Sequence, residues 1–150
     1  MLTINPEPLD SDDARRLIGE LDAHLHSMYP PEDNFTELPF ADAFMIACDD
    51  GRAVGCGAVR FIDEGVGEVK RMYVEPSARA NGVGREIMRA LETFAISQGA
   101  HRLVLETGPK QLEAIKLYER FGFTRTDCWG EYAHAGNSIC YEKFLRSGVT

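Results

Sequence analysis

The sequence has little basic charge and no long apolar run. Its 150 residues include 16 Lys and Arg against 24 Asp and Glu, which gives a formal net charge of −8. Proteins that bind nucleic acid meet the backbone phosphates with a surplus of Lys and Arg, so we expect no nucleic-acid partner. No apolar stretch approaches the length that a membrane-spanning helix requires, so a membrane partner has no support either.

Paired metal-ligand motifs are also lacking. The cysteines form no Cys-x-x-Cys pair, which excludes the common zinc spacings and a thioredoxin-like motif. His24 and His26 lie two residues apart, so they do not share a helix face, and His101 and His134 are isolated; we expect no metal site. Residues 1–10 contain no basic region followed by an apolar run, so we expect no signal peptide and a cytoplasmic location. Reduced thiols are typical of that compartment, and we expect them at Cys48, Cys56, Cys128 and Cys140.

The length predicts a single domain over residues 1–150, with a core large enough to need no disulfide or metal. Apolar spacing predicts helices from Ser11 to the stop at Tyr29-Pro30-Pro31, from Gly84 to Gly99, and over 109–120. Residues 30–42 are irregular, with room for a short helix. Strands are expected at 2–4, 44–48, 53–62, 66–74, 102–106, 123–126 and 138–145. The order β-α-βββ-α-β-α-ββ predicts an α+β (mixed α/β) fold, with a central, mostly antiparallel mixed sheet flanked by helices.

A glycine-containing loop, Arg-Ala-Asn-Gly-Val-Gly-Arg at 79–85, links an expected strand to an expected helix. No Lys-Ser/Thr follows Gly84, which excludes a P-loop, and Ile87 replaces the third glycine of a dinucleotide fingerprint. Glycines allow close backbone approach, and the first amides of a helix have no internal partner. The positive end of the helix, together with Arg79 and Arg85, suits a phosphate or pyrophosphate. An ordinary strand–helix connection is the alternative.

Five segments in order carry a resemblance to a known family. They are the strand 66–74, the loop Arg79-x-x-Gly82-x-Gly84, the helix through Phe94, the strand 103–107, and Leu-Tyr-Glu-Arg-Phe-Gly-Phe at 117–123. The series resembles the acetyl-coenzyme-A-binding core of the GNAT superfamily of N-acetyltransferases, over roughly residues 44–126. The resemblance implies that fold, acetyl-CoA as co-substrate and acetyl transfer to an amine.

The resemblance also implies which residues bind the cofactor. The loop amides would hold the diphosphate of coenzyme A, with charge from the two arginines: Arg79, Ala80, Asn81, Gly82, Val83, Gly84 and Arg85. The family's central strand is splayed and leaves backbone groups free beside the acetyl group, here those of Met72, Tyr73 and Val74. The apolar positions of this strand slip in phase, which indicates a β-bulge. Gln111 stands where the family often has an Asn that contacts the cofactor, so its geometry there is open.

Acyl transfer from a thioester to an amine requires a base, an oxyanion site and an acid for the departing thiolate. The family position of the acid matches Tyr118, which the resemblance also places against the cofactor. Helical spacing offers the alternative of a core aromatic. For the base we expect Glu68, acting through water, because a charge on a central strand is costly unless it faces solvent or a site. A solvated strand face shared with Lys70 and Arg71 is the alternative.

We expect a small-molecule amine as the acceptor, and Glu106 as a second candidate base or as a binder of a cationic substrate. The family builds its acceptor pocket from segments that here contain Tyr29 and Tyr132. Three other functions stay open: a catalytically silent acetyl-CoA-binding regulator, a protein N-terminal or lysine acetyltransferase, and a transferase of longer acyl groups or to oxygen. A homodimer also stays open.

Overall fold

Seven strands form one mixed sheet in the computed structural model, which describes residues 1–30, 38 and 40–146. The element order confirms the predicted one; the segment 30–42, for which a short helix was considered, lies mostly outside the described residues. The elements are β1 (Leu2–Pro6), α1 (Asp12–Met28), β2 (Ala43–Asp49), β3 (Arg52–Asp63), β4 (Val66–Val74), η2 (Pro76–Ala78), α2 (Val83–Ser97), β5 (Arg102–Thr107), α3 (Leu112–Arg120), β6 (Thr124–Thr126), η3 (Gly130–Tyr132) and β7 (Ile139–Phe144).

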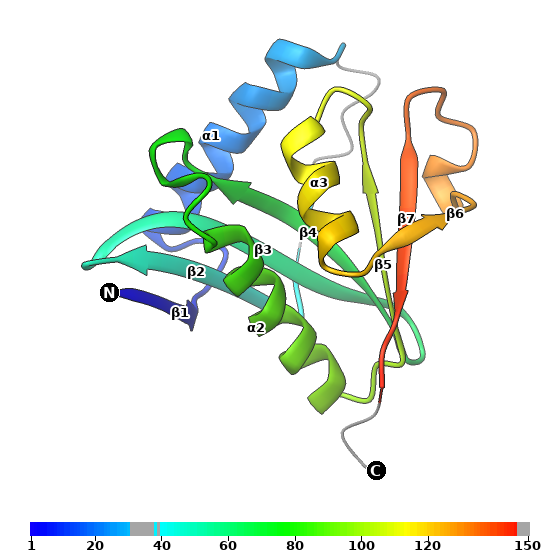
Figure 1. Ribbon diagram of the computed structural model, residues 1–150, viewed down its shortest axis with the longest axis horizontal. Coiled ribbons are helices and arrows are strands. Elements are labelled where there is room, and N and C mark those ends of the chain that lie inside the picture. The colour runs from blue at the N-terminus through cyan, green and yellow to red at the C-terminus, as the bar shows by residue number, and fades with distance from the viewer. Residues whose placement is uncertain (31–37, 39, 147–150) are drawn as a thin grey trace.

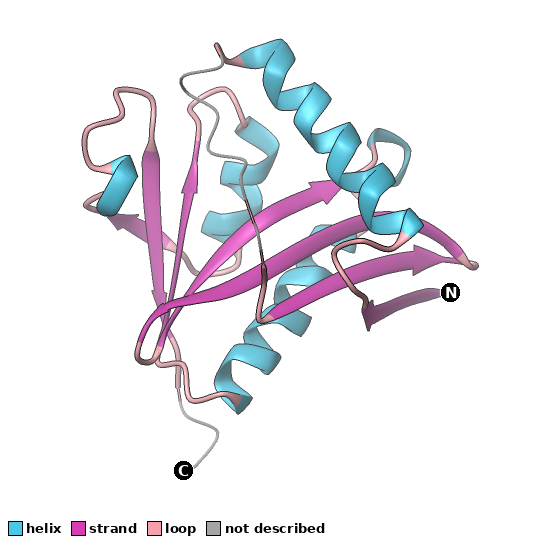
Figure 2. Cartoon of the chain, turned by 180° about the vertical axis from the view of Figure 1, so that it is seen from behind, coloured by secondary structure: helices cyan, strands magenta, loops and turns pink. Residues whose placement is uncertain are grey.

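The sheet order is β1-β2-β3-β4-β5-β7-β6, and every neighbouring pair is antiparallel except β4 and β5. Helices α2 and α3 cover one face of the sheet, while α1 crosses the other face (Figures 1 and 2). The two faces have separate apolar cores, because Leu17 and Leu21 of α1 pack in one buried cluster and Ile87 and Leu91 of α2 pack in another. The mixed α/β fold is therefore confirmed.

Helix α1 begins and ends where its sequence predicts. Ser11 is its N-cap, and the Ser11 hydroxyl accepts a hydrogen bond from the Ala14 amide at 3.1 Å. The helix ends at Met28, before the extended Tyr29 that precedes Pro30. Helix α3 begins at Leu112 rather than at the predicted residue 109, because residues 108–111 form a turn in which the Gln111 N–H donates to Gly108 O at 3.1 Å.

The central strands β4 and β5 separate partway along their length. Their parallel pairing covers only Val66–Val69 opposite 102–105. On the other edge of β4, Tyr73 pairs with Cys56 but Lys70 pairs with Ala58, so two β4 residues lie opposite one residue of β3. Arg71, inside this bulge, has a φ of 60°. The predicted bulge is thus confirmed, and the β4 edge beyond Val69 has no strand partner on the β5 side.

Two of the four cysteines form a disulfide, so the prediction of four reduced thiols was wrong. Cys128 follows β6 and Cys140 lies on β7, and their Cα atoms are 5.2 Å apart. The antiparallel pairing of Thr126 with Cys140 brings the two together, which their separation of 12 in sequence does not reveal. Cys48 and Cys56 are free, as expected. The disulfide closes the loop that carries Tyr132.

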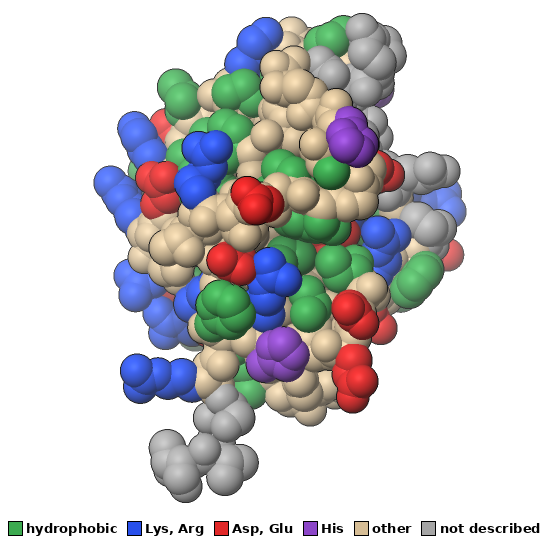
Figure 3. Space-filling model, turned by 90° about the vertical axis from the view of Figure 1, so that its right-hand side faces the viewer, with side chains coloured by type: hydrophobic (Ala, Val, Ile, Leu, Met, Phe, Trp, Pro, Cys, Tyr) green, Lys and Arg blue, Asp and Glu red, His purple; other side chains and the backbone are tan. Residues whose placement is uncertain are grey.

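One face of the molecule carries charge of both signs. Figure 3 shows Lys and Arg side chains interspersed with Asp and Glu on one face of the molecule. None of the helices within residues 1–30 and 40–146 has the length and apolar character that a membrane crossing requires.

Candidate active site

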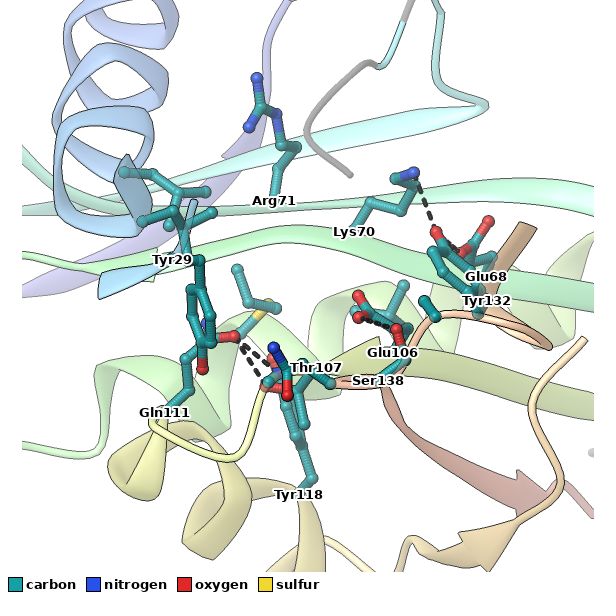
Figure 4. Close-up of a pocket in the computed structure, with 17 residues that line it drawn as sticks. Tyr29, Glu68, Lys70, Arg71, Glu106, Thr107, Gln111, Tyr118, Tyr132 and Ser138 are labelled. Atoms are coloured by element: carbon teal, nitrogen blue, oxygen red, sulfur yellow. Dashed lines mark hydrogen bonds between the residues drawn. The ribbon is translucent and has the colours of Figure 1, made fainter. Parts of the chain in front are cut away.

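A pocket of about 810 Å³, its open mouth included, lies where β4 and β5 separate. Its walls come from α1, β4, the β5–α3 connection, α3 and the β6–β7 loop (Figure 4). Seven of the side chains predicted for catalysis, cofactor binding or substrate binding line it: Tyr29, Glu68, Met72, Glu106, Gln111, Tyr118 and Tyr132. The pocket thus brings together residues up to 103 positions apart, from Tyr29 to Tyr132.

The predicted diphosphate loop has the donors that such a group needs. Gly82, with φ 78°, caps α2 without a side-chain hydrogen bond. The first helical bond of α2 runs from Glu86 N to Gly82 O, and no hydrogen bond of the described residues uses an amide of residues 80–85. Arg85 is exposed at the same helix end. Unused amides, a helix N-terminus and a free guanidinium together fit the diphosphate of coenzyme A.

Arg79 and Tyr73 are arranged differently from the rest of the predicted cofactor set. The Arg79 side chain folds back against β4. Its Nε donates to Val74 O at 2.9 Å, and its Cζ lies 6.0 Å from the centroid of the Tyr73 ring. The Tyr73 side chain faces α1 and donates to Glu20 at 3.0 Å; burial and this carboxylate raise the Tyr73 pKa to about 12. The Tyr73 ring therefore faces α1 and not the split.

Tyr118 of α3 reaches the pocket from the helix side of the sheet. Its ring is 6% exposed and packs edge-on against Phe123 at 6.1 Å. No hydrogen bond among the described residues involves its hydroxyl. Burial, with the charge of Glu106, raises the Tyr118 pKa, so the phenol stays protonated at neutral pH. The Tyr118 hydroxyl is therefore a protonated group in the pocket, and it can donate its proton without breaking a hydrogen bond to the described residues.

Glu68 is 2% exposed, which is incompatible with a solvated strand face. Tyr132 donates its hydroxyl proton to Glu68 Oε2 at 2.7 Å, and Arg60 lies 3.5 Å from Oε1. Burial and the charge of Glu68 raise the Tyr132 pKa, so Tyr132 is a donor toward the carboxylate. Lys70 in turn donates to the Tyr132 hydroxyl at 3.3 Å. The candidate base and a predicted substrate-binding residue are thus in direct contact.

Glu106, at the end of β5, lies across the split from β4. Its Oε2 accepts from the Ser138 hydroxyl at 2.8 Å. Burial raises the Glu106 pKa, while the Ser138 hydrogen bond and the charge of Lys70 act in the opposite direction. The sequence indicated no role for Lys70 or Ser138. The i, i+2 spacing of Glu68 and Lys70 on one strand face is a signal that could have identified Lys70.

Tyr29 fastens α1 to the β5–α3 connection. Its hydroxyl accepts from Lys110 N at 2.8 Å, and Lys110 Nζ donates to Met28 O at 2.8 Å. Gln111, beside it, uses its Oε1 to accept from Thr107 Oγ1 at 3.1 Å and Gly108 N at 2.9 Å. The Gln111 amide nitrogen is the part of this side chain that is left for a ligand.

Gly108→Ala is expected to displace Tyr29 from the pocket wall. A Cβ at this position would overlap the Tyr29 ring and hydroxyl, which a packed side chain can avoid only by moving. We expect a loss of about 1–3 kcal/mol of stability and a higher KM for the acceptor, measured by thermal melting and steady-state kinetics. Gly136→Ala is the matched control, because a Cβ there meets nothing within 4 Å. Equal melting temperatures of the two variants would contradict the role of Tyr29 as a fastener.

No group of three or more His, Cys, Asp or Glu side chains in the described parts of the chain is placed to hold a metal ion. The polar groups that line the pocket are hydroxyls, carboxylates, side-chain amides, a guanidinium and one ammonium. Such a set suits proton transfer and hydrogen bonding to an acyl group.

Comparison with known proteins gives the same assignment as the geometry. The model of the acetyltransferase (GNAT) family matches residues 11–123. An IAA acetyltransferase of Azospirillum brasilense is 39% identical, over 96% of this chain and 98% of that protein. A crystal structure of a Klebsiella pneumoniae protein assigned as an acyl-CoA N-acyltransferase superposes with a TM-score of 0.86 at 33% identity, covering 97% and 99% of the two chains. A GNAT acetyltransferase of Elizabethkingia anophelis with acetyl-CoA bound superposes at 0.70 and 18% identity, over 96% and 98%.

The residues 11–123 that match the family include the separating strands β4 and β5 and the loop with unused amides before α2. The chain belongs to the GNAT acetyltransferase family and is an acetyl-CoA-dependent N-acetyltransferase.

Proposed function

We propose that this enzyme transfers the acetyl group of acetyl-CoA directly to the amino group of a small molecule within a ternary complex. The observation that carries the proposal is the single pocket at the β4–β5 split, which holds an unbonded tyrosine hydroxyl and two carboxylates. A direct transfer needs an acid and a base beside one reacting centre, and this pocket contains both kinds of group. The name of the Azospirillum relative supports a small acceptor.

Acetyl-CoA supplies the activated acetyl thioester, and the chain supplies binding and proton transfer. The amides of residues 80–85, with Arg85, hold the diphosphate. Backbone groups on the free edge of β4, those of Met72 and Val74, face the acyl part and donate to the thioester oxygen as it becomes negative. The Gln111 amide nitrogen adds a further contact.

Two side chains move protons in the proposed mechanism. Glu68, through water, accepts the proton that the amino group must lose as its nitrogen bonds to the acetyl carbon. When the carbon–sulfur bond breaks, Tyr118 donates its proton to the sulfur and regains one from solvent. Glu106 binds the acceptor's ammonium form, while Tyr29 and Tyr132 form its side walls. A small acceptor is supported by the walls that both α1 and the β6–β7 loop contribute to the pocket.

A thiol-release assay with acetyl-CoA and a panel of amines tests this function. The panel covers amino acids, polyamines, amino-bearing antibiotics and peptides with free N-termini or lysines, and calorimetry measures acetyl-CoA binding in parallel. We expect one class of small amine to give turnover. Acetyl-CoA binding without turnover on any amine would favour a regulatory binder, and turnover on peptides alone would favour a protein acetyltransferase. Propionyl- and butyryl-CoA in the same assay measure the acyl-length preference.

A further inference from the structure

Three charged side chains are buried in the described part of the chain, and one of them differs from the others. Glu75 is paired with Arg16 and with Arg52, each at 2.6 Å, and Glu68 is paired with Arg60 at 3.5 Å. Lys70 is 9% exposed, and none of the ion pairs among the described residues includes it. A buried charge is costly unless it is paired, so an ammonium with only a phenol partner indicates a missing anion.

The Lys70 ammonium lies in the pocket wall. It comes from β4 on the same side as Glu68 and extends toward the Tyr132 hydroxyl, 3.3 Å away (Figure 4). The adjacent Arg71 is already neutralised by Asp22 at 2.7 Å. Lys70 is therefore the cation of this wall that an anionic group of a ligand would neutralise.

Opposite charges face each other across the β4–β5 split. Glu106 lies on β5, and the charge of Lys70 acts against the effect of burial on the Glu106 pKa, so the two groups interact without forming an ion pair. The carboxylate has one oxygen, Oε1, outside its Ser138 hydrogen bond. One pocket thus offers a cation on one strand and a carboxylate on the other.

We propose that the acceptor is a zwitterion, a small amino acid whose carboxylate binds Lys70 while its amino group lies toward Glu106 and Glu68. This inference rests on the proposed function, since it specifies the amine that is acetylated. A molecule with both charges neutralises both walls at once. A polyamine instead brings a second cation toward a buried ammonium, and an uncharged amine leaves that ammonium unpaired.

Matched acceptors and one substitution test the proposal. For each amino acid of the panel, the assay includes the methyl ester and the decarboxylated amine with the same side chain. We expect wild type to prefer the free amino acid by roughly 100-fold in kcat/KM, because loss of the carboxylate leaves a buried polar group unpaired. In Lys70→Met, kcat/KM for the amino acid falls by about the same factor, while the values for the ester and for acetyl-CoA stay within about threefold. Lys116→Met, on the exposed side of α3, is the control for the change of net charge.

Binding provides a readout that does not depend on turnover. Calorimetry of the amino acid with the CoA-saturated enzyme should show binding to wild type and to Lys116→Met but not to Lys70→Met. If Lys70→Met does not fold, Lys70→Gln, which keeps a donor for Tyr132, takes its place. Esters or decarboxylated amines used as well as amino acids, or an equal loss on all acceptors in Lys70→Met, would overturn the zwitterion while amine acetylation stands. No turnover with any amine, together with amino-acid binding that requires Lys70, would refute the proposed function and leave the zwitterion site in place.

Discussion

Replacing Tyr118 by Phe is expected to lower kcat by about 10²–10³-fold while the affinity for acetyl-CoA changes little. The hydroxyl makes no hydrogen bond to the described residues, so its removal breaks no structural contact. The ring keeps its edge-on packing against Phe123. The variant cannot protonate the departing thiolate. Solvent must supply that proton instead, and it does so more slowly. Thiol release measures kcat, and calorimetry measures acetyl-CoA binding.

Tyr141→Phe is the matched control for this substitution. Unlike that of Tyr118, its hydroxyl donates to a carboxylate, Glu119 at 2.9 Å, and Tyr141 does not line the pocket. The control should keep wild-type kcat within about twofold, as is usual for a change away from the reacting groups. Equal kcat in wild type and Tyr118→Phe would show that Tyr118 is a core aromatic, the alternative that helical spacing alone offers.

The pH dependence of kcat gives a second check on Tyr118. Because burial raises its pKa, the phenol keeps its proton to higher pH than a free tyrosine does. Wild-type kcat should therefore show no fall assigned to Tyr118 between pH 7 and about 10, the ordinary pKa of a phenol. A fall in that range that disappears in Tyr118→Phe would mean that the hydroxyl is less buried in the working enzyme.

The sequence predicted the local structure well because caps and periodicity are local properties. Ser11 caps α1 as its position before two acids indicates, and the phase slip in β4 corresponds to a bulge at Arg71. The loop of residues 79–85 is placed before α2, and the amides of residues 80–85 are unused among the described residues, as the glycines suggested. These features need no information from distant parts of the chain.

Contacts between distant segments were the part that the sequence did not reveal. The Cys128–Cys140 bond depends on the β6–β7 register, and no local motif marks it. Tyr132 was placed near the substrate, but its hydrogen bond to Glu68 joins residues 64 positions apart through an irregular loop. Lys70 was passed over as a surface charge, since its burial depends on that loop covering β4. The identities of Tyr118 and Glu68 as candidates came from the family resemblance and not from periodicity.

Glu68→Gln and Glu106→Gln are expected to separate the base from the amine-binding carboxylate. Glu68→Gln should lower kcat by about 10²-fold, with KM for the acceptor changed by less than about threefold, because the amide cannot accept the proton. The substituted side chain still accepts from Tyr132, and Arg60, with its side chain 25% exposed, keeps access to water. Structural damage is therefore a minor part of the expected loss.

Glu106→Gln should instead raise the acceptor KM about tenfold and leave kcat within a fewfold, because it removes a charge that attracts the ammonium but keeps an acceptor for Ser138. Since burial raises the Glu106 pKa, wild type should lose acceptor affinity as pH falls through that raised value, when the carboxylate takes up a proton. This acid limb of kcat/KM should disappear in Glu106→Gln and persist in Glu68→Gln. The reverse pattern, with kcat lost in Glu106→Gln and KM raised in Glu68→Gln, would exchange the two roles: Glu106 would be the base, and Glu68, held by Tyr132 and Arg60, would organise the wall that carries Lys70.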